Sequence, residues 1–440
     1  MSYRIVNARI VNEGTITEGD LTVGADRILG INVSSPPGAT VVDADGAYLL
    51  PGMIDDQVHF REPGLEYKAT IETESRAAVA GGITSYMEMP NTNPQTITRD
   101  ALVDKHARAA ARSMANYAFY FGATNDNLEA IKAVDQRLAC GVKVFMGSST
   151  GNMLVDDERT LEGIFASSPL VIATHCEHTP TIAANEAAAR ARYGADIPFS
   201  EHPKIRSVEA CYRSSSLAVA LAKRHDARLH VLHITTAREL DLFQPGDLAD
   251  KRITAEACVH HLFFNESSYE TKGADIKCNP AIKSADDQQA LWAAVNDGRI
   301  DVIATDHAPH TTAEKSRPYA DAPAGLPLVQ HAIPSLFEHV HDGHFTIETV
   351  VDKTAHAPAR LFDVAERGFI REGYWADLVL VHPTQGTAPH PVLAKCGWSP
   401  FSHVVLRAQV RMTWVNGELR YRHGEFLPGR GGRALEFIRP

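Results

Sequence analysis

Residues 51–60 read PGMIDDQVHF, a short apolar run that ends in polar residues. Runs of the same kind recur along the chain: GITSYMEMP (82–90), YAFYFGAT (117–124), GVKVFMG (141–147), PLVIATHCE (169–177), RLHVLHIT (228–235), ITAEACVHHL (253–262) and DVIATDHAPH (301–310). Short apolar runs are typical of strands buried on both faces of a parallel sheet. The sequence therefore predicts eight such strands.

Helix-like segments separate several of these runs, at residues 69–82, 157–168, 208–225 and 287–298. A repeated alternation of strand and helix is typical of an α/β fold with a parallel sheet. We therefore expect a TIM-like (β/α)8 barrel over residues 51–369.

Both ends of the chain have a different pattern. Residues 1–50 contain short alternating segments broken by Gly, Asp and Pro, which is typical of a small antiparallel sheet. Residues 370–440 repeat the pattern, and Asn416-Gly417 is a strong hairpin signal. We expect the two ends to form one small composite β-sandwich domain.

The composition limits the partners and the compartment. The net charge is −11, from 43 basic and 54 acidic residues, which argues against a nucleic-acid or anionic membrane surface and favours a small-molecule partner. The six cysteines are widely spaced, which fits a reducing compartment. The N-terminus alternates like a strand, and no run approaches the roughly 20 apolar residues of a membrane helix. We expect a cytoplasmic protein.

Polar residues of metal-binding type terminate many of the predicted strands. In a barrel, catalytic side chains lie at the carboxyl ends of the strands. Those ends carry His59, Lys143, His175, His233, Asp306 and His310. A single histidine is more often a surface or core residue, but recurrence after successive strands predicts one shared site. Imidazoles and a carboxylate suit zinc, with a position left open for water.

These motifs resemble a known family. HFREPG (59–64), MPNT (89–92), GVKVFMG, ATHCE, LHIT and ATDHAPHTTAEK (304–315) are similar to those of the amidohydrolase superfamily, and most closely to dihydroorotases, in the same order over nearly the whole chain. The resemblance implies reversible interconversion of N-carbamoyl-L-aspartate and L-dihydroorotate in pyrimidine biosynthesis. A homodimer is also implied by the resemblance alone.

The resemblance further implies a metal centre with a carboxylated lysine. A CO2-derived carbamate on Lys143 would bridge the metals, His175 and His233 would bind one zinc ion, and His59 and Asp306 would bind the other. The alternative for Lys143 is a snorkelling barrel lysine. This chain has Gln57 where the family has the first histidine of its DxHxH motif, so we expect one or two zinc ions.

The implied chemistry assigns the remaining residues. Zinc would activate a water and polarise the ring carbonyl, and Asp306 would act as general base and then general acid. Asp306 as a helix cap is the alternative. Arg61, Asn91, Asn279 and His310 would bind the substrate carboxylate. Alternatively, Arg61 forms a surface ion pair with Glu62, and the two asparagines are turn residues beside prolines.

Other functions remain open. A hydantoinase or an allantoinase would share the metal ligands and Asp306, although HFREPG and Asn91 favour a substrate that carries a carboxylate. A catalytically silent subunit of a partner enzyme is the alternative that Gln57 supports. The segment 311–327 is either a loop that shields the site or a passive connection.

Overall fold

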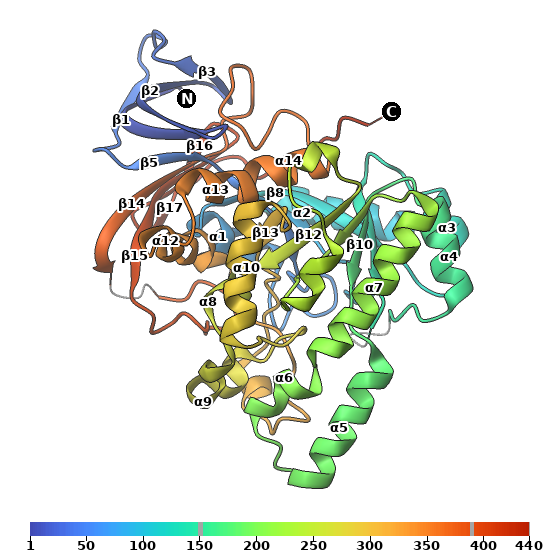
Figure 1. Ribbon diagram of the computed structural model, residues 1–440. Helices are drawn as coiled ribbons and strands as arrows, with labels where there is room; N and C mark the ends of the chain where they lie inside the picture. The colour runs from blue at the N-terminus through green and yellow to red at the C-terminus, as the bar shows by residue number, and fades with distance from the viewer. Residues whose placement is uncertain (148–152, 388–390, 440) are drawn as a thin grey trace.

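The computed structural model describes residues 1–147, 153–387 and 391–439. Its centre is an eight-stranded parallel sheet in the order β13-β12-β11-β10-β9-β8-β7-β6 (Figure 1). The strands are β6 (Met53–Val58), β7 (Ile83–Glu88), β8 (Asn116–Gly122), β9 (Ala139–Phe145), β10 (Ile172–His175), β11 (Leu229–Val231), β12 (Ile253–Cys258) and β13 (Val302–Ala304). The sheet closes because Val58 forms a parallel bridge with His307, and the His59 amide donates to the His307 carbonyl at 2.7 Å. The predicted (β/α)8 barrel is confirmed.

Helices surround the barrel, and those that the sequence predicts begin and end at recognisable caps. In α7 (Val208–His225), the Ser207 side chain accepts from the Ala210 amide, and the helix ends at the left-handed Asp226. In α10 (Ala285–Asp297), Ser284 and Asp287 form a capping box. The other helices are α1 (Ile71–Ala80), α2 (Arg99–Arg112), α3 (Leu128–Lys132), α4 (Glu158–Ser167), α5 (Thr179–Tyr193), α6 (His202–Ile205), α8 (Val259–Phe263), α9 (Tyr269–Lys272), α11 (Thr312–Lys315), α12 (Ala332–His341), α13 (Ile347–Val351) and α14 (Ala357–Leu361).

Short turns of other helix types connect these elements. They are η1 (Phe199–Glu201), η2 (Arg238–Leu242), η3 (Leu248–Asp250), η4 (Glu266–Ser268), η5 (Gly273–Ile276), η6 (Val329–His331) and the π-helical η7 (Asp352–His356). No helix within the described ranges is both long enough and apolar enough to cross a membrane.

The two chain ends meet in one nine-stranded sheet beside the barrel (Figure 1). Its strands are β1 (Tyr3–Asn12), β2 (Thr15–Gly24), β3 (Arg27–Ile31), β4 (Thr40–Asp43), β5 (Tyr48–Pro51), β14 (Leu378–Thr387), β15 (Leu406–Val415), β16 (Glu418–Arg422) and β17 (Glu425–Phe426). One buried cluster joins Ile5 and Leu21 from the N-terminal end to Leu378 and Trp414 from the C-terminal end. The expected composite β domain is confirmed.

The hairpin predicted at Asn416-Gly417 joins β15 to β16. Asn416 has φ 51° and Gly417 has φ 76°, which matches the pair of positive φ angles that a type I′ turn requires. The turn is close-packed, since a Cβ on Gly417 would lie 2.3 Å from the Ala25 carbonyl oxygen.

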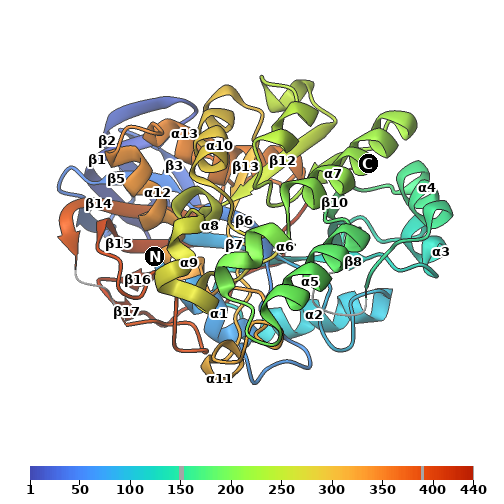
Figure 2. The ribbon, with the colours of Figure 1, turned by 60° about the horizontal axis from the view of Figure 1, so that its bottom comes forward.

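A projecting lobe marks the end of the barrel where the strands terminate. Only three residues separate the end of β10 from the start of α5, so α5 starts on the carboxyl side of the barrel. Helices α5 and α6 project at the bottom of Figure 1 and come forward in Figure 2. The site described below lies at this end.

Candidate active site

Several of the predicted site residues converge on one small cavity. The cavity has a volume of about 20 Å³, enough for a water molecule. Its lining includes Gln57, His59, Phe145, His175, His233, Asn279, Asp306, Ala308, Ala324 and Gly325. The predicted residues Arg61, Asn91, Lys143 and His310 lie outside this lining, although each contacts a residue of the site.

His59 presents a ring nitrogen to Asp306. Its Nδ1 lies 2.8 Å from the Asn91 side-chain oxygen, which can only accept, so the Nδ1 proton faces Asn91. When the ring is neutral, the lone pair therefore lies on Nε2, 3.2 Å from Asp306 Oδ1. Burial first, together with the charges of Arg61 and Lys143, holds the pKa of His59 well below its ordinary value. Two electron-pair donors face each other, as expected where a cation binds between them.

His175 and His233 form a second pair of the same kind. His175 Nε2 lies 3.1 Å from Glu177 Oε2, so its proton faces that carboxylate, and Nδ1 lies 3.0 Å from His233 Nε2. Burial lowers the pKa of both imidazoles. Glu177 is itself held by Arg206, and a carboxylate behind a ligating histidine is a common way to orient a metal ligand.

Lys143 lies on β9 beside the cavity and is 1% exposed. Its Nζ lies 4.7 Å from the centre of the Phe145 ring. Burial lowers the pKa of Lys143 to about 8, although the nearby Asp306 and Glu256 carboxylates oppose the shift. A buried amine that loses its proton easily is chemically suited to react with CO2.

Asp306 is buried at the end of β13, with a left-handed φ of 50°. Its Oδ1 accepts a hydrogen bond from Gln57 Nε2 at 3.1 Å. Burial raises the pKa of Asp306 to about 7, with Lys143 and His175 acting in the opposite direction. A carboxylate with a pKa near 7 is poised to exchange protons at neutral pH.

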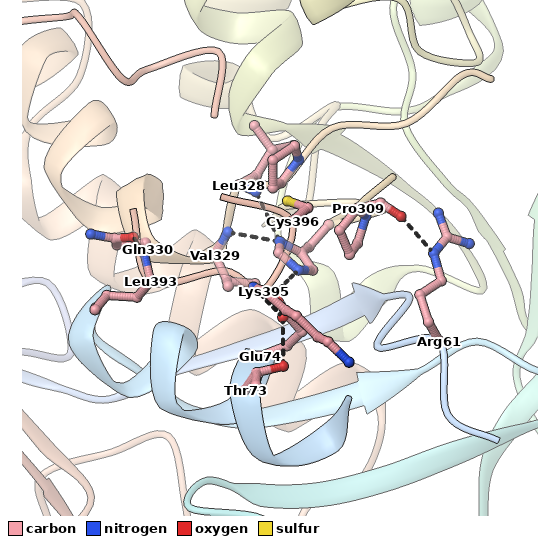
Figure 3. Close-up of polar contacts among 12 residues, drawn as sticks. Arg61, Thr73, Glu74, Pro309, Leu328, Val329, Gln330, Leu393, Lys395 and Cys396 are labelled. Atoms are coloured by element: carbon pink, nitrogen blue, oxygen red, sulfur yellow. Dashed lines mark hydrogen bonds and ion pairs between the residues drawn. The ribbon is translucent and has the colours of Figure 1, made fainter. Parts of the chain in front are cut away.

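Arg61 is buried, so the alternative of a surface ion pair with Glu62 is wrong. Its Nε donates to the Pro309 carbonyl at 3.1 Å (Figure 3), and Nη2 lies 3.2 Å from His310 Nε2. Glu62 pairs instead with Arg108 and Arg112. Within the described part of the chain, Arg61 therefore has only neutral hydrogen-bond partners.

Asn279 also has an unused polar atom. It lines the cavity, and its buried Oδ1 has no hydrogen-bond partner among the described residues. A buried acceptor without a partner is costly, so the side chain is expected to gain a donor when a ligand binds. A second cavity of about 160 Å³ shares Asn279 and Ala324 with the first and extends towards α5 and α6.

Glu74 on α1 fixes the loop that carries Asp306, and sequence reasoning missed it. His307 Nδ1 accepts from the Leu328 and Val329 amides, so its proton lies on Nε2, which donates to Glu74 Oε2 at 2.8 Å. The other Glu74 oxygen accepts from the Lys395 amide at 3.0 Å (Figure 3). The only signal in the sequence was an acidic residue on the apolar face of a helix.

A buried polar network beneath the cavity was also missed. His230 Nε2 lies 3.2 Å from Asp56 Oδ2 and 3.8 Å from Glu256 Oε2, and Glu256 Oε1 accepts from the His233 amide. Burial disfavours the charged ring, but the two carboxylates raise the pKa of His230 to about 9. The signal was an acidic residue inside an apolar strand, at positions 56 and 256.

Among the described residues, two groups of three potential metal ligands lie close enough together to share an ion, and neither is the predicted set. One is Asp56, His230 and Glu256, where the charged His230 ring already lies between the two carboxylates and has no lone pair to offer a metal. The other is Cys258, His260 and His261, where burial raises the pKa of the thiol well above its ordinary value. The predicted ligands form two pairs instead, and Lys143 would add a ligand atom only as its carbamate.

The segment 311–327 forms part of the cavity wall. Ala324 and Gly325 line the cavity, and Lys315 Nζ donates to the carbonyls of Lys277, Pro323 and Gly325. The segment is therefore more than a passive connection, because two of its residues line the cavity.

A match to a protein-family model shows the family to which this chain belongs. The Amidohydrolase family model matches residues 48–420. The chain belongs to the amidohydrolase family. This amidohydrolase is 37% identical over 369 residues to a dihydroorotase of Halobacterium salinarum, covering 83% of this chain and 84% of the relative. It is 30% identical to an allantoinase of Streptomyces avermitilis, covering 90% of this chain and 89% of the relative.

A solved structure with the same fold is the L-hydantoinase (dihydropyrimidinase) of Arthrobacter aurescens. The TM-score is 0.93 at 26% identity, and the match covers 99% of both chains. Dihydroorotases, allantoinases and hydantoinases are all cyclic amidohydrolases. This amidohydrolase is therefore an enzyme of the cyclic amidohydrolase class.

Proposed function

We propose that this enzyme is a dihydroorotase, which interconverts N-carbamoyl-L-aspartate and L-dihydroorotate in pyrimidine biosynthesis. Dihydroorotases at 37% and 31% identity support the proposal, and they cover 83% and 90% of the chain. The observation that carries it is the environment of Arg61.

Arg61 is a buried cation with no ion-pair partner among the described residues, although the Asp306 and Glu88 carboxylates act on its charge from a distance. Burial lowers the pKa of its guanidinium only to about 10, so it stays charged at neutral pH. A buried charge is costly unless it is paired, and the planar guanidinium matches a carboxylate in a bidentate geometry. Dihydroorotate carries a carboxylate on its ring, whereas hydantoin and allantoin carry none. The unpaired Arg61 therefore favours dihydroorotate.

The paired histidines and Asp306 suit a zinc centre. His175, His233 and His59 offer imidazole lone pairs, and Asp306 offers a carboxylate oxygen. Neutral Lys143 would add to CO2, forming a nitrogen–carbon bond and releasing a proton, and the resulting carbamate would supply oxygen ligands. Zinc at such a site supplies Lewis acidity and activates water near neutral pH.

The chain's own residues then move the proton and hold the substrate. Asp306 accepts the proton that the attacking water loses and returns it to the ring nitrogen when the amide bond breaks. Arg61, His310 and Asn91 bind the carboxylate side, and Asn279 offers its unused polar group to the ring. Ring closure follows the same steps in reverse.

A second candidate is another cyclic amidohydrolase, an allantoinase or a hydantoinase. The 30% identity to an allantoinase and the TM-score of 0.93 to an L-hydantoinase favour it. Either substrate would leave Arg61 without a carboxylate partner.

Genetic complementation tests the proposal. A bacterium that lacks its own dihydroorotase needs added pyrimidine, and we expect this chain to restore growth without it. The Asp306→Asn variant is the matched control, which should fail at equal expression. Growth that still needs pyrimidine when the wild-type chain is expressed, folded and supplied with zinc would contradict the proposal.

A further inference from the structure

Gln57 presents its amide nitrogen, and not its oxygen, to the candidate metal centre. The side chain is 1% exposed. Its Nε2 donates to Asp306 Oδ1 at 3.1 Å, while its Oε1 lies 3.9 Å from Cys258 Sγ. Only the NH2 end of an amide can donate to a carboxylate oxygen, and an amide nitrogen has no lone pair free to bind a metal. In this orientation Gln57 is a hydrogen-bond donor and not a ligand.

The His175–His233 pair and the His59–Asp306 pair therefore differ as metal sites. At the first, His175 Nδ1 and His233 Nε2 face each other at 3.0 Å, and Glu177 contacts His175 at the other ring nitrogen, Nε2. At the second, Asp306 Oδ1 faces His59 Nε2 at 3.2 Å but already accepts from Gln57. A cation at the second pair would meet the partial positive charge of the Gln57 NH2 group. The second pair is the poorer metal site.

We infer that Gln57 takes the place of a metal ion: it holds the Asp306 carboxylate, and the chain binds one metal, on the side of His175, His233 and Lys143. The inference rests on the proposed metal-dependent function. Gln57 acts here as a positioning residue, because it acts through Asp306. Its donor bond fixes the carboxylate that a second cation would otherwise hold.

Metal stoichiometry tests the inference. The full-length protein is loaded with Zn²⁺ in bicarbonate buffer, dialysed and analysed for metal per chain. We expect one ion in the wild type and two in Gln57→His, which supplies a lone pair in place of the NH2 group. Gln244→His is the matched control, because Gln244 is an exposed residue of the loop after η2, and it should bind one ion.

Electron paramagnetic resonance on the Mn²⁺-loaded proteins gives a second readout. An isolated Mn²⁺ spectrum is expected for the wild type and a spin-coupled pair for Gln57→His. Two ions in the wild type would overturn the inference and leave the proposed function intact, whereas no ion would overturn both. One ion in a folded Gln57→His would show that Gln57 does not exclude the second metal. The number of metal ions bound by the wild-type protein tests the inference even if the variant does not fold.

The positioning role has its own test. Gln57→Met keeps the length of the side chain and removes the donor. We expect one metal still bound and turnover about 10- to 100-fold lower, the usual effect of losing a hydrogen bond to a charged group. Unchanged turnover at one metal per chain would overturn the positioning role.

Discussion

Arg61 is the residue at which substrate recognition can be separated from hydrolysis. Replacing it with Met removes a buried cation that has neutral partners, Pro309 and His310. We expect kcat/KM for dihydroorotate to fall about 100-fold, because the substrate carboxylate loses its charged partner. Any residual hydantoin hydrolysis should change little. An equal loss on both substrates would instead mean that Arg61 holds the loop of Pro309.

His230 gives a prediction about stability and pH. Its pKa is raised to about 9, so the stability it contributes is fully present below the ordinary imidazole pKa near 6.5 and is lost as pH rises through about 9. His230→Gln leaves Asp56 and Glu256 facing each other, and should cost about 3–5 kcal/mol at pH 6.5. Urea unfolding at pH 6.5 and pH 9.5 should show a smaller difference from wild type at the higher pH. If the difference in the free energy of unfolding between wild type and His230→Gln grew with pH, it would contradict a charged His230 ring.

Single residues also show which features of the site could be predicted from the sequence and which could not. The motifs predicted that His59, His175, His233 and Asp306 meet, because strand ends of a barrel converge. They could not predict which end of the Gln57 amide faces Asp306, since that depends on neighbours far away in the sequence. The same holds for Arg61, whose neighbour Glu62 pairs with residues of α2.

At the scale of elements, helix α1 supports the loop after β13. Glu74 is buried and accepts from both His307 and the Lys395 amide. Glu74→Ala leaves these donors unsatisfied, so we expect a loss of about 2–4 kcal/mol in the free energy of unfolding and a lower kcat. Glu72→Ala, at an exposed position of the same helix, is the control for helix stability. A Glu74→Ala protein with unchanged kcat would show that the loop does not depend on this contact.

The segment around α11 is predicted to depend on one lysine. Lys315 holds three carbonyls of the cavity wall and its surroundings, and burial lowers its pKa to about 7. Lys315→Met should raise KM and make the stretch from α11 to Gly325 more sensitive to limited proteolysis. Lys223→Met, at an exposed position of α7, should change neither quantity. Unchanged proteolysis in Lys315→Met would show that other contacts hold the wall.

The strands and main helices were predictable because each has a local signal. Helix α7 was predicted at 208–225 and spans those residues, since Ser207 caps one end and Asp226 closes the other. Segment 311–327 was not predictable, because its place depends on hydrogen bonds that Lys315 donates to the distant Lys277 carbonyl and, within the segment, to the Pro323 and Gly325 carbonyls.

At the scale of the molecule, Asp377 joins the composite β sheet to the barrel. It pairs with the buried Arg367, and its other contacts are Asn116 of β8 and the Asn416 amide of the hairpin. Asp377→Ala should destabilise the protein by about 3–5 kcal/mol, because Arg367 keeps an unpaired buried charge. Calorimetry should show a lower unfolding temperature for Asp377→Ala than for Glu372→Ala, an exposed neighbour. Equal unfolding temperatures for the two variants would contradict the role of Asp377 in joining the β sheet to the barrel.

The most direct test of the central claim is ring opening of L-dihydroorotate by the purified, zinc-loaded chain, followed by loss of absorbance. Hydantoin and allantoin are assayed in parallel, and metal is measured on the same sample. The unpaired Arg61 predicts turnover of dihydroorotate with kcat/KM about 100-fold or more above the two neutral rings. A folded, metal-loaded protein that prefers a neutral ring would identify another cyclic amidohydrolase, and one that opens none of the three would identify a silent subunit.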